Sequence, residues 1–257
     1  MPARRCLCAL LAAAIGLLPT WALPCDVKSG PQTTALVELY TSEGCSSCPP
    51  AEARLNQLPS LSGSAIPMAL HVPYWDYIGW RDRFAQPGFV QRQQWLVRAN
   101  GGQSVFTPHM FVSGSELLFW RNELEAAIRQ INSLPARASV EMHGHALRPN
   151  VLALEVRANA NASNAAEAAL YVAVTESGFN SKVMAGENEG QTLREDHVVR
   201  LWLGPLPLNG APLYIQKAVL VPPGWNKPLL NLVAFVQSQR TGEVLQSATM
   251  PVCFGDH

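Results

Sequence analysis

Residues 35–58 read "ALVELYTSEGCSSCPPAEARLNQL", and this stretch decides the fold. Its opening run, 35–40, has the apolar, strand-forming composition of a buried strand. Cys45 and Cys48 follow in a short polar turn. After Pro49, alanine and leucine recur at helical spacing until Pro59 ends the run. This order predicts a strand, a C-x-x-C turn and a helix.

The chain continues to alternate strands and helices up to about residue 135. Strands are predicted at 66–72 and 109–114, with a hairpin partner at 116–120, and helices are predicted before Gly101-Gly102 and at 121–134. This order is typical of an α/β protein in which helices cover both faces of one mixed sheet.

The pattern changes beyond Pro135. Helical periodicity fades, and short alternating runs such as "VLALEVRA" and "LLNLVAFVQ" are separated by turn sequences such as "PLNGAP". Strands at this spacing predict an antiparallel, sandwich-like domain. We therefore expect a helix-containing domain over residues 23–135 and a β-rich domain over residues 136–257.

The first 22 residues have the layout of a secretory signal peptide. A basic start, "MPARR", precedes a short apolar stretch, and the small residue Ala22 marks the expected cleavage site. An uncleaved membrane anchor is the alternative, although no longer apolar run follows. We expect a mature protein that is periplasmic or secreted and does not span the membrane after cleavage.

Charge and motifs exclude several functions. The 257 residues carry 19 basic and 19 acidic side chains, so a broad basic face for nucleic acid is not expected. The sequence contains no phosphate loop, G-x-S-x-G or H-E-x-x-H motif, and nucleotide or hydrolase chemistry therefore has no support. No cofactor is predicted.

Export leaves four cysteines in the mature chain: Cys25, Cys45, Cys48 and Cys253. Four cysteines allow three pairings, and an oxidising compartment permits any of them. Cys45 and Cys48 form the close pair. A structural disulfide between Cys25 and Cys253 would close most of the mature chain, which is worth about 4–5 kcal/mol in the chain-entropy model.

The C-x-x-C turn sits where thiol–disulfide exchange needs it. The N-terminus of a helix favours a thiolate, and a second thiol nearby can resolve a mixed disulfide. Pro49 suits the first helical position and disfavours helical geometry at Cys48, which we expect to cap the helix. Cys45 is then predicted to lie on an exposed turn and to attack, with Cys48 resolving. Glu43 nearby would raise the pKa of a thiol.

A second feature supports redox chemistry. Thr107-Pro108 precedes the strand predicted at 109–114. Cis peptide bonds are largely confined to X-Pro steps, and a cis Pro108 facing the cysteines would leave the backbone at Thr107 free to pair with an extended substrate. We therefore assign Pro108 to the catalytic set and Thr107 to substrate binding.

Four motifs carry a family resemblance: "LYTSEGCSSCPPAE", "HVPYWDYIGWRDRFA", "VFTPHMFVSG" and "ENEGQTLREDHVVR". Together they resemble a bacterial family of predicted exported proteins catalogued as domain of unknown function 1223, within the thioredoxin-like superfamily. The resemblance implies a thioredoxin-like fold and export, but no established reaction. Cys45, Cys48 and Pro108 match thioredoxin-type functional positions. Ser46-Ser47 departs from the dipeptides of well-known relatives, which leaves the redox potential open.

Residues 71–84 are dense in aromatic side chains. Trp75 and Tyr77 are interpreted as a wall of the substrate cleft, with a small packed core as the alternative. Asp76 is a candidate proton acceptor for Cys48, or else a capping or ion-pairing residue.

Several polar side chains could have either a functional role or an ordinary role at the protein surface. His109 is a candidate copper or zinc ligand together with Cys45 and Cys48, the alternative being a solvent-facing strand histidine. His143 and His145 should share one face of a strand and are interpreted as surface residues. Three charged residues of the fourth motif are expected on the solvated face of a strand: Glu195, Asp196 and Arg200.

Three functions follow from these observations. The leading one is an exported thiol–disulfide oxidoreductase acting on protein thiols or disulfides, with a membrane electron donor as a further partner. The second is a copper- or zinc-binding module. The third is a non-enzymatic envelope protein in which the Cys45–Cys48 disulfide is structural.

Overall fold

The computed structural model describes residues 26–58 and 65–254. Within these residues the strands form three hydrogen-bonded sheets, of eight, four and two strands. The largest contains β2 (Ala35–Thr41), β3 (Ala65–His71), β4 (His109–Val112), β5 (Ser115–Glu116), β8 (Ala168–Glu176), β11 (Val198–Pro207), β13 (Leu230–Ser238) and β14 (Val244–Pro251). The four-stranded sheet contains β1 (Asp26–Lys28), β6 (Ala138–Arg148), β7 (Val151–Ala160) and β12 (Leu213–Leu220). A hairpin pairs β9 (Phe179–Lys182) with β10 (Thr192–Glu195).

Two long helices and several short ones accompany the sheets. They are α1 (Pro49–Asn56), α3 (Pro87–Ala99), α4 (Trp120–Asn132), the short α5 (Ala162–Ala165) and the 3-10 helices η1 (Pro73–Ile78) and η2 (Lys227–Leu229). The predicted strand at 116–120 is wrong beyond Glu116. Leu117 N still donates to Met110 O, but Leu118 and Phe119 are exposed and α4 begins at once.

The large sheet is mixed, in the order β14-β13-β8-β11-β3-β2-β4-β5. β2 runs parallel to β3 and antiparallel to β4. β2 is buried along its whole length, as expected for an apolar run covered on both faces. The single parallel pairing of Val198 with Ala69 joins β11 to β3, so strands from both sides of residue 135 share one sheet.

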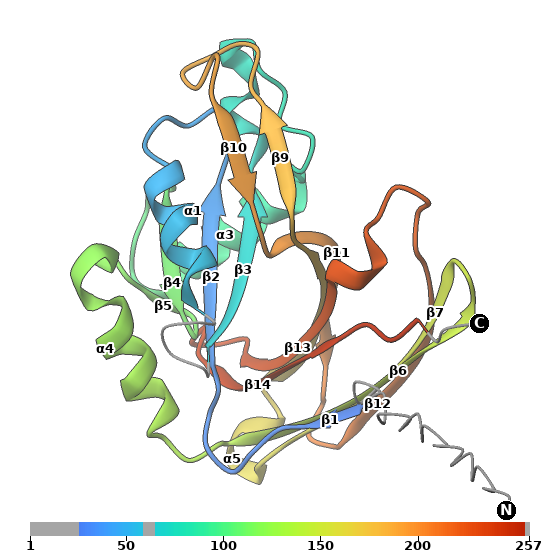
Figure 1. Ribbon diagram of the computed structural model, residues 1–257. Coiled ribbons are helices and arrows are strands. Elements are labelled where there is room, and N and C mark those ends of the chain that lie inside the picture. Colours follow the sequence, from blue (N-terminus) through green and yellow to red (C-terminus); the bar gives the residue numbers. More distant parts are fainter. Residues whose placement is uncertain (1–25, 59–64, 255–257) are drawn as a thin grey trace, which may run out of the picture.

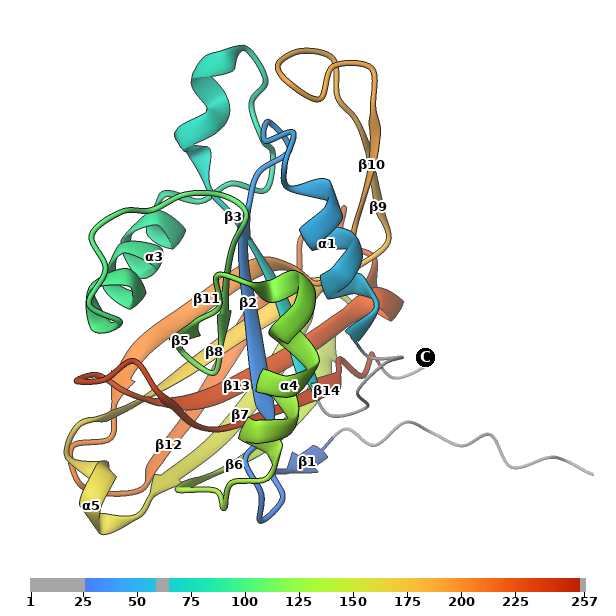
Figure 2. The same cartoon turned by 90° about the vertical axis from the view of Figure 1, so that its left-hand side faces the viewer.

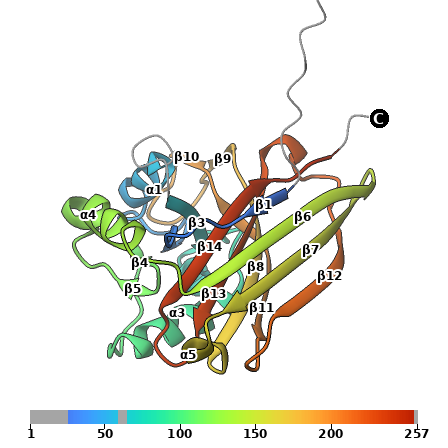
Figure 3. The same ribbon diagram turned by 90° about the horizontal axis from the view of Figure 1, so that it is seen from below.

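Helices and the four-stranded sheet cover the large sheet differently on its two faces (Figures 1 and 2). Ala35, Val37 and Leu39 of β2 pack under α1 and α4. Leu36 and Tyr40 point the other way, toward α3. The four-stranded sheet lies against β8, β13 and β14, as Figure 3 shows, and their inward side chains form an apolar core. The alternating runs after residue 135 therefore do produce a packed, mainly antiparallel region.

Candidate functional site

The C-x-x-C turn leaves the end of β2 and enters α1 directly. Cys45 N donates to Ser42 O at 3.0 Å, and Cys48 N donates to Cys45 O at 3.1 Å. Cys45 and Cys48 form a disulfide, with their Cα atoms 5.4 Å apart. Cys48 is the N-cap and Pro49 the first helical residue, as predicted. The backbone of Cys48 is nevertheless helical (φ −79°, ψ −39°), because the turn hydrogen bond and the disulfide hold it there.

The helix start offers few backbone donors to a thiolate. Pro49 and Pro50 occupy the first two helical positions and carry no N–H group. The next two N–H groups, of Ala51 and Glu52, donate to Cys48 O. The Ser47 hydroxyl contacts the sulfur, with its Oγ 3.4 Å from Cys45 Sγ. A Cys45 thiolate would therefore depend on Ser47 and on the helix dipole.

Burial of the cysteines is the main difference from expectation. Cys45 was predicted on an exposed turn, but Cys45 and Cys48 are both 0 % exposed, whereas Ser46 and Ser47 are exposed. The prediction is wrong because two distant segments cover the turn. The first is the loop at residues 183–191 that joins β9 to β10, called here the covering loop.

Side chains of the covering loop form hydrogen bonds to the backbone of the disulfide turn. The buried Asn188 donates from Nδ2 to Glu43 O at 2.9 Å and to Cys45 O at 3.0 Å. Glu187 Oε2 accepts from Ser46 N at 3.0 Å and from Ser46 Oγ at 2.7 Å, and these bonds hold the pKa of Glu187 below its usual range. The loop has thus replaced solvent on one side of the disulfide turn.

The second cover is η1, which brings other predicted site residues to the turn. A Cβ on Gly44 would lie 3.1 Å from Trp75 Cβ, so the two segments are in close contact. Trp75 Nε1 donates to Thr107 Oγ1 at 2.7 Å. Pro108 follows, and the Thr107–Pro108 peptide bond is cis, as expected. Tyr77 is 81 % exposed and has no described contact with the turn.

A buried cluster of ionisable side chains lies beside the disulfide turn. Its members come from the turn, α1, β3, the segment after η1, and β10: Glu43, Glu52, His71, Asp82 and Glu195. Glu43 N donates to Asp82 Oδ2 at 2.9 Å, which ties the cluster to the cysteine turn. His71 Nδ1 lies 2.7 Å from Asp82 Oδ2, and Thr41 Oγ1 donates to Glu52. Sequence reasoning missed this cluster because its members lie on five separate segments.

Burial sets the protonation of the cluster. It opposes a charge on His71, but the adjacent Asp82 outweighs it and the pKa of His71 rises to about 10. Burial would raise the pKa of Asp82, but His71 lowers it. Burial raises the pKa of Glu195 to about 9, and it also raises the pKa of Glu52. At neutral pH the cluster therefore holds a charged His71–Asp82 pair and a protonated Glu195.

Three buried polar atoms of the cluster have no hydrogen-bond partner among the described residues: Glu43 Oε1, His71 Nε2 and Glu195 Oε1. Burying such atoms unpaired costs about 1–3 kcal/mol each. Glu195 was expected on a solvated face with Asp196 and Arg200, and this is wrong. Glu195 and Asp196 are buried and Arg200 is half-buried, because the β9–β10 hairpin folds over the end of β3.

Glu195 gives the stability a pH dependence of defined sign. Its stabilising contribution is complete below the unfolded value of 4.5 and is lost as pH rises through the folded pKa of about 9. Glu195→Gln keeps the uncharged form and should reduce the loss of unfolding free energy between about pH 5 and about pH 8 by up to about 4 kcal/mol. Urea unfolding at both pH values measures this effect.

Glu189→Gln is the matched control for that measurement, because Glu189 is exposed on the covering loop and its side chain has no described contact. The control should keep the wild-type pH slope. A Glu195→Gln variant with the wild-type slope would contradict the assignment of Glu195 as a protonated buried acid.

Other predicted residues lie away from this arrangement. Asp76 accepts from Asp82 N at 3.2 Å and is not part of the buried cluster, so the candidate proton acceptors are Glu52 and its neighbours instead. His109 is buried, not solvent-facing. Its Nδ1 lies 3.2 Å from Gln93 Nε2 and its Nε2 lies 2.6 Å from Glu116 Oε1, so both ring nitrogens are engaged away from the cysteines.

Metal binding gains no support from the geometry of the described residues. Within residues 26–58 and 65–254, no group of three or more His, Cys, Asp or Glu side chains is arranged to hold a metal ion. Cys253 follows β14, but Cys25 lies outside the described residues, as does the predicted signal peptide. The Cys25–Cys253 disulfide therefore stays a prediction.

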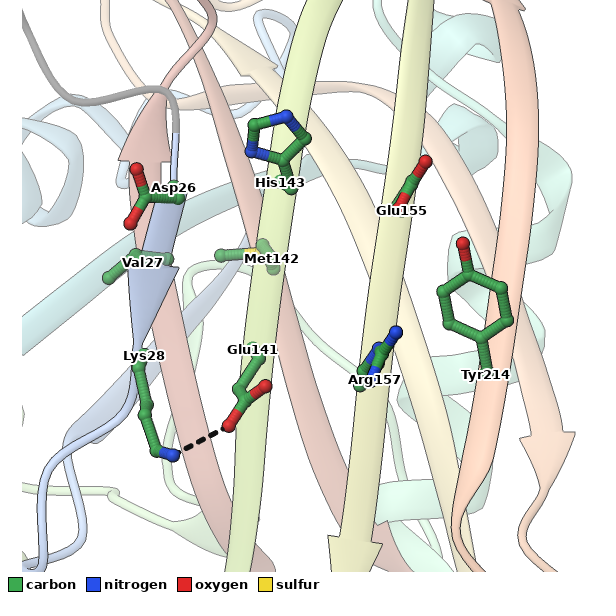
Figure 4. A pocket seen from close by; sticks show the side chains of 9 residues that line it. All are labelled: Asp26, Val27, Lys28, Glu141, Met142, His143, Glu155, Arg157 and Tyr214. Carbon is green, nitrogen blue, oxygen red and sulfur yellow. Dashed lines mark ion pairs between the residues drawn. The ribbon is translucent and has the colours of Figure 1, made fainter.

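A shallow pocket of about 340 Å³ marks the outer face of the four-stranded sheet (Figure 4). Lys28 and Glu141 form an ion pair there at 2.7 Å, and the Arg157 guanidinium lies 5.0 Å from the centroid of the Tyr214 ring. His143 lines this pocket, and His143 and His145 are exposed on the same strand face, as predicted. Opposite charges alternate across the strands, which is typical of a solvated sheet face.

The fold and the site define a mixed α/β protein with a buried disulfide at a strand–helix junction, beside a buried ionisable cluster. The chain belongs to the family described as a protein of unknown function (DUF1223), whose model matches residues 36–237. No curated protein matches the chain. None of the helices in the described part of the chain has the length and apolar character needed to span a lipid bilayer.

Two solved structures are similar over most of the chain. Protein AGR_C_4864 from Agrobacterium tumefaciens is 19 % identical, with 89 % of this chain and all (100 %) of that chain covered and a TM-score of 0.58. HBP35 of Porphyromonas gingivalis is 15 % identical, with coverages of 87 % and 76 % and a TM-score of 0.62. At these identities the similarity concerns the fold alone.

Proposed function

We propose that this chain is an exported thiol–disulfide oxidoreductase that acts through Cys45 and Cys48, in a thioredoxin-like part of the fold. The single observation that carries the proposal is the disulfide at the junction of β2 and α1, tied by hydrogen bonds to a buried cluster of proton-holding side chains. Redox-active thiols need a nearby group that accepts and returns protons. The order β3-β2-β4-β5, with helices on both faces, supports the thioredoxin-like assignment.

The disulfide contributes little as a staple. It links residues only three positions apart, which is worth about 2 kcal/mol in the chain-entropy model. The same turn is already closed by backbone hydrogen bonds and by Asn188. A bond that adds so little constraint is better explained by its chemistry.

The reaction transfers two electrons from the reduced pair to a partner disulfide. The Cys45 thiolate attacks one partner sulfur, forms a mixed disulfide and releases the other partner sulfur as a thiolate. Cys48 then passes its proton to a buried carboxylate, for which Glu52, one turn along α1, is the candidate. Cys48 attacks Cys45 Sγ, which re-forms the Cys45–Cys48 disulfide and releases the second partner thiolate. A dithiol donor, such as a membrane electron donor, re-reduces the pair.

Insulin reduction by the mature chain tests the proposal. Cys45→Ser should abolish turnover, whereas Cys48→Ser should accumulate a mixed disulfide through Cys45 that is visible on a non-reducing gel. Glu189→Gln, on the exposed side of the covering loop, should keep wild-type turnover.

The full burial of both sulfur-bearing side chains favours a second candidate, a non-enzymatic protein with a structural disulfide. The reduction potential separates the two, because structural disulfides lie below about −300 mV. A potential below that value, no turnover and a stable Cys45→Ser/Cys48→Ser double variant would overturn the oxidoreductase proposal.

A further inference from the structure

A pocket of about 440 Å³ lies on the face of the large sheet that α3 covers, opposite the face that carries α1. Its walls come from α3, β8, β11 and the segment after β13. Four aromatic residues line it: Phe89, Trp95, Tyr171 and Trp202. Three glutamine side chains lie among them: Gln86, Gln91 and Gln239. The lining thus combines aromatic faces with amides that both donate and accept hydrogen bonds.

The two indoles of the pocket differ in their packing. Trp202 packs against Phe89, Tyr171 and Phe235, with ring centroids 5.5–6.2 Å apart, and Trp95 joins none of these ring pairs. Both indoles are half-buried, so each keeps part of its surface open to the pocket.

Arg92 is the one charged residue in the pocket lining. The Arg92 guanidinium carbon lies 4.6 Å from the centroid of Trp202 and 5.7 Å from that of Trp95. Its Nε and Nη2 donate to Glu38 at 2.6 and 2.8 Å, and Nη2 also donates to Gln237. Nη1 makes no hydrogen bond to any described residue, and Arg92 is 8 % exposed.

These contacts leave the Arg92 guanidinium with one unused donor and with its charge already compensated. Glu38 lies behind Arg92 and compensates it, so a carboxylate or phosphate ligand would meet a guanidinium that is already paired. An uncharged oxygen acceptor needs only the free Nη1 donor. The pocket is therefore better suited to a neutral, oxygen-rich ligand than to an anion.

We propose that this pocket binds a neutral saccharide ring. The weakly positive C–H groups of a sugar ring match the negative face of Trp95. Sugar hydroxyls both donate and accept, as the Gln91 amide does, and one hydroxyl oxygen accepts from Arg92 Nη1. A flat aromatic ligand would use the Trp95 indole but would leave the Gln91 amide and Arg92 Nη1 without partners. The amides of Gln86 and Gln239 are already bonded within the protein. The proposal is independent of the chemistry at Cys45 and Cys48.

Saturation-transfer NMR on the mature chain tests this site with glucose, N-acetylglucosamine and maltose as probes, and with benzoate and indole for comparison. We expect transfer to the ring protons of at least one sugar, with an affinity of about millimolar. Trp95→Ala should weaken that binding at least about tenfold. Trp225→Ala, a half-buried tryptophan outside the pocket, should leave it unchanged.

Three outcomes would overturn the proposal: no transfer to any of the three sugars, equal transfer in the Trp95→Ala variant, or binding of benzoate or indole without any sugar. Gln91→Ala is a second test that spares the core, since Gln91 is exposed on α3. It should weaken sugar binding while the thermal midpoint stays that of the wild type. Sugar binding that is indifferent to both substitutions places the sugar elsewhere and contradicts the site.

Discussion

Asn188→Ala should raise the rate at which dithiothreitol cleaves the Cys45–Cys48 disulfide at least about tenfold. The buried Asn188 amide makes two hydrogen bonds to the disulfide turn, at 2.9 and 3.0 Å. Each is worth about 1 kcal/mol, and about 1.4 kcal/mol changes the open fraction of the loop tenfold. Reductant can attack only when the loop is open, because both cysteines are 0 % exposed in the closed form. Thiol release followed by mass spectrometry or a chromogenic reagent measures the rate.

Glu189→Gln is the matched control, because it changes the same loop at an exposed position without a described contact to the turn. It should leave the cleavage rate at the wild-type value. Equal rates for the wild type and Asn188→Ala would show that the covering loop does not control access. This result would not by itself reject the oxidoreductase proposal, which the reduction potential tests separately.

The second large effect concerns the ion pair of Arg92 and Glu38 on the α3 face of the sheet. Both side chains are buried, and Arg92 donates twice to the carboxylate. Removing one partner leaves a buried charge without compensation, so Glu38→Gln should lower the free energy of unfolding by about 3–5 kcal/mol. The double variant Glu38→Leu/Arg92→Met should recover much of that loss, because no buried charge remains. Urea unfolding measures both variants.

Glu141→Gln provides the comparison, because Glu141 pairs with Lys28 on an open surface where both side chains are exposed. Exposed ion pairs contribute little, and this variant should unfold like the wild type. A Glu38→Gln variant that is also as stable as the wild type would contradict the buried-charge argument.

The local stability of the covering loop controls access to the proposed redox site at Cys45 and Cys48. Glu187 and Asn188 lie more than one hundred residues after the cysteines, but Glu187 accepts from Ser46 N and Asn188 donates to Cys45 O. The proposed redox activity would then require a partner or a fluctuation that displaces these two side chains. Loops that open locally are drawn from the less stable parts of a fold, which suits this role.

Local features were readable from the sequence because they depend on neighbouring residues. The apolar run at 35–40 produced β2, Pro49 set the first turn of α1, and Cys48 became its N-cap. The alternating runs after residue 135 became antiparallel strands with one buried face, as in β6 and β7. Strand and helix periodicity carry this information within about ten residues.

The environment of the cysteines was decided only by the tertiary structure. The sequence by itself determined a C-x-x-C pair between a strand and a helix. The pairing of β11 with β3 and the placement of the β9–β10 hairpin then brought Asn188 and Glu195 to that turn. These contacts join residues far apart in the chain, so no local pattern encodes them. They bury a turn that local composition marks as exposed, and they turn the acidic side chain of Glu195 into a protonated one, because burial depends on what packs against a residue.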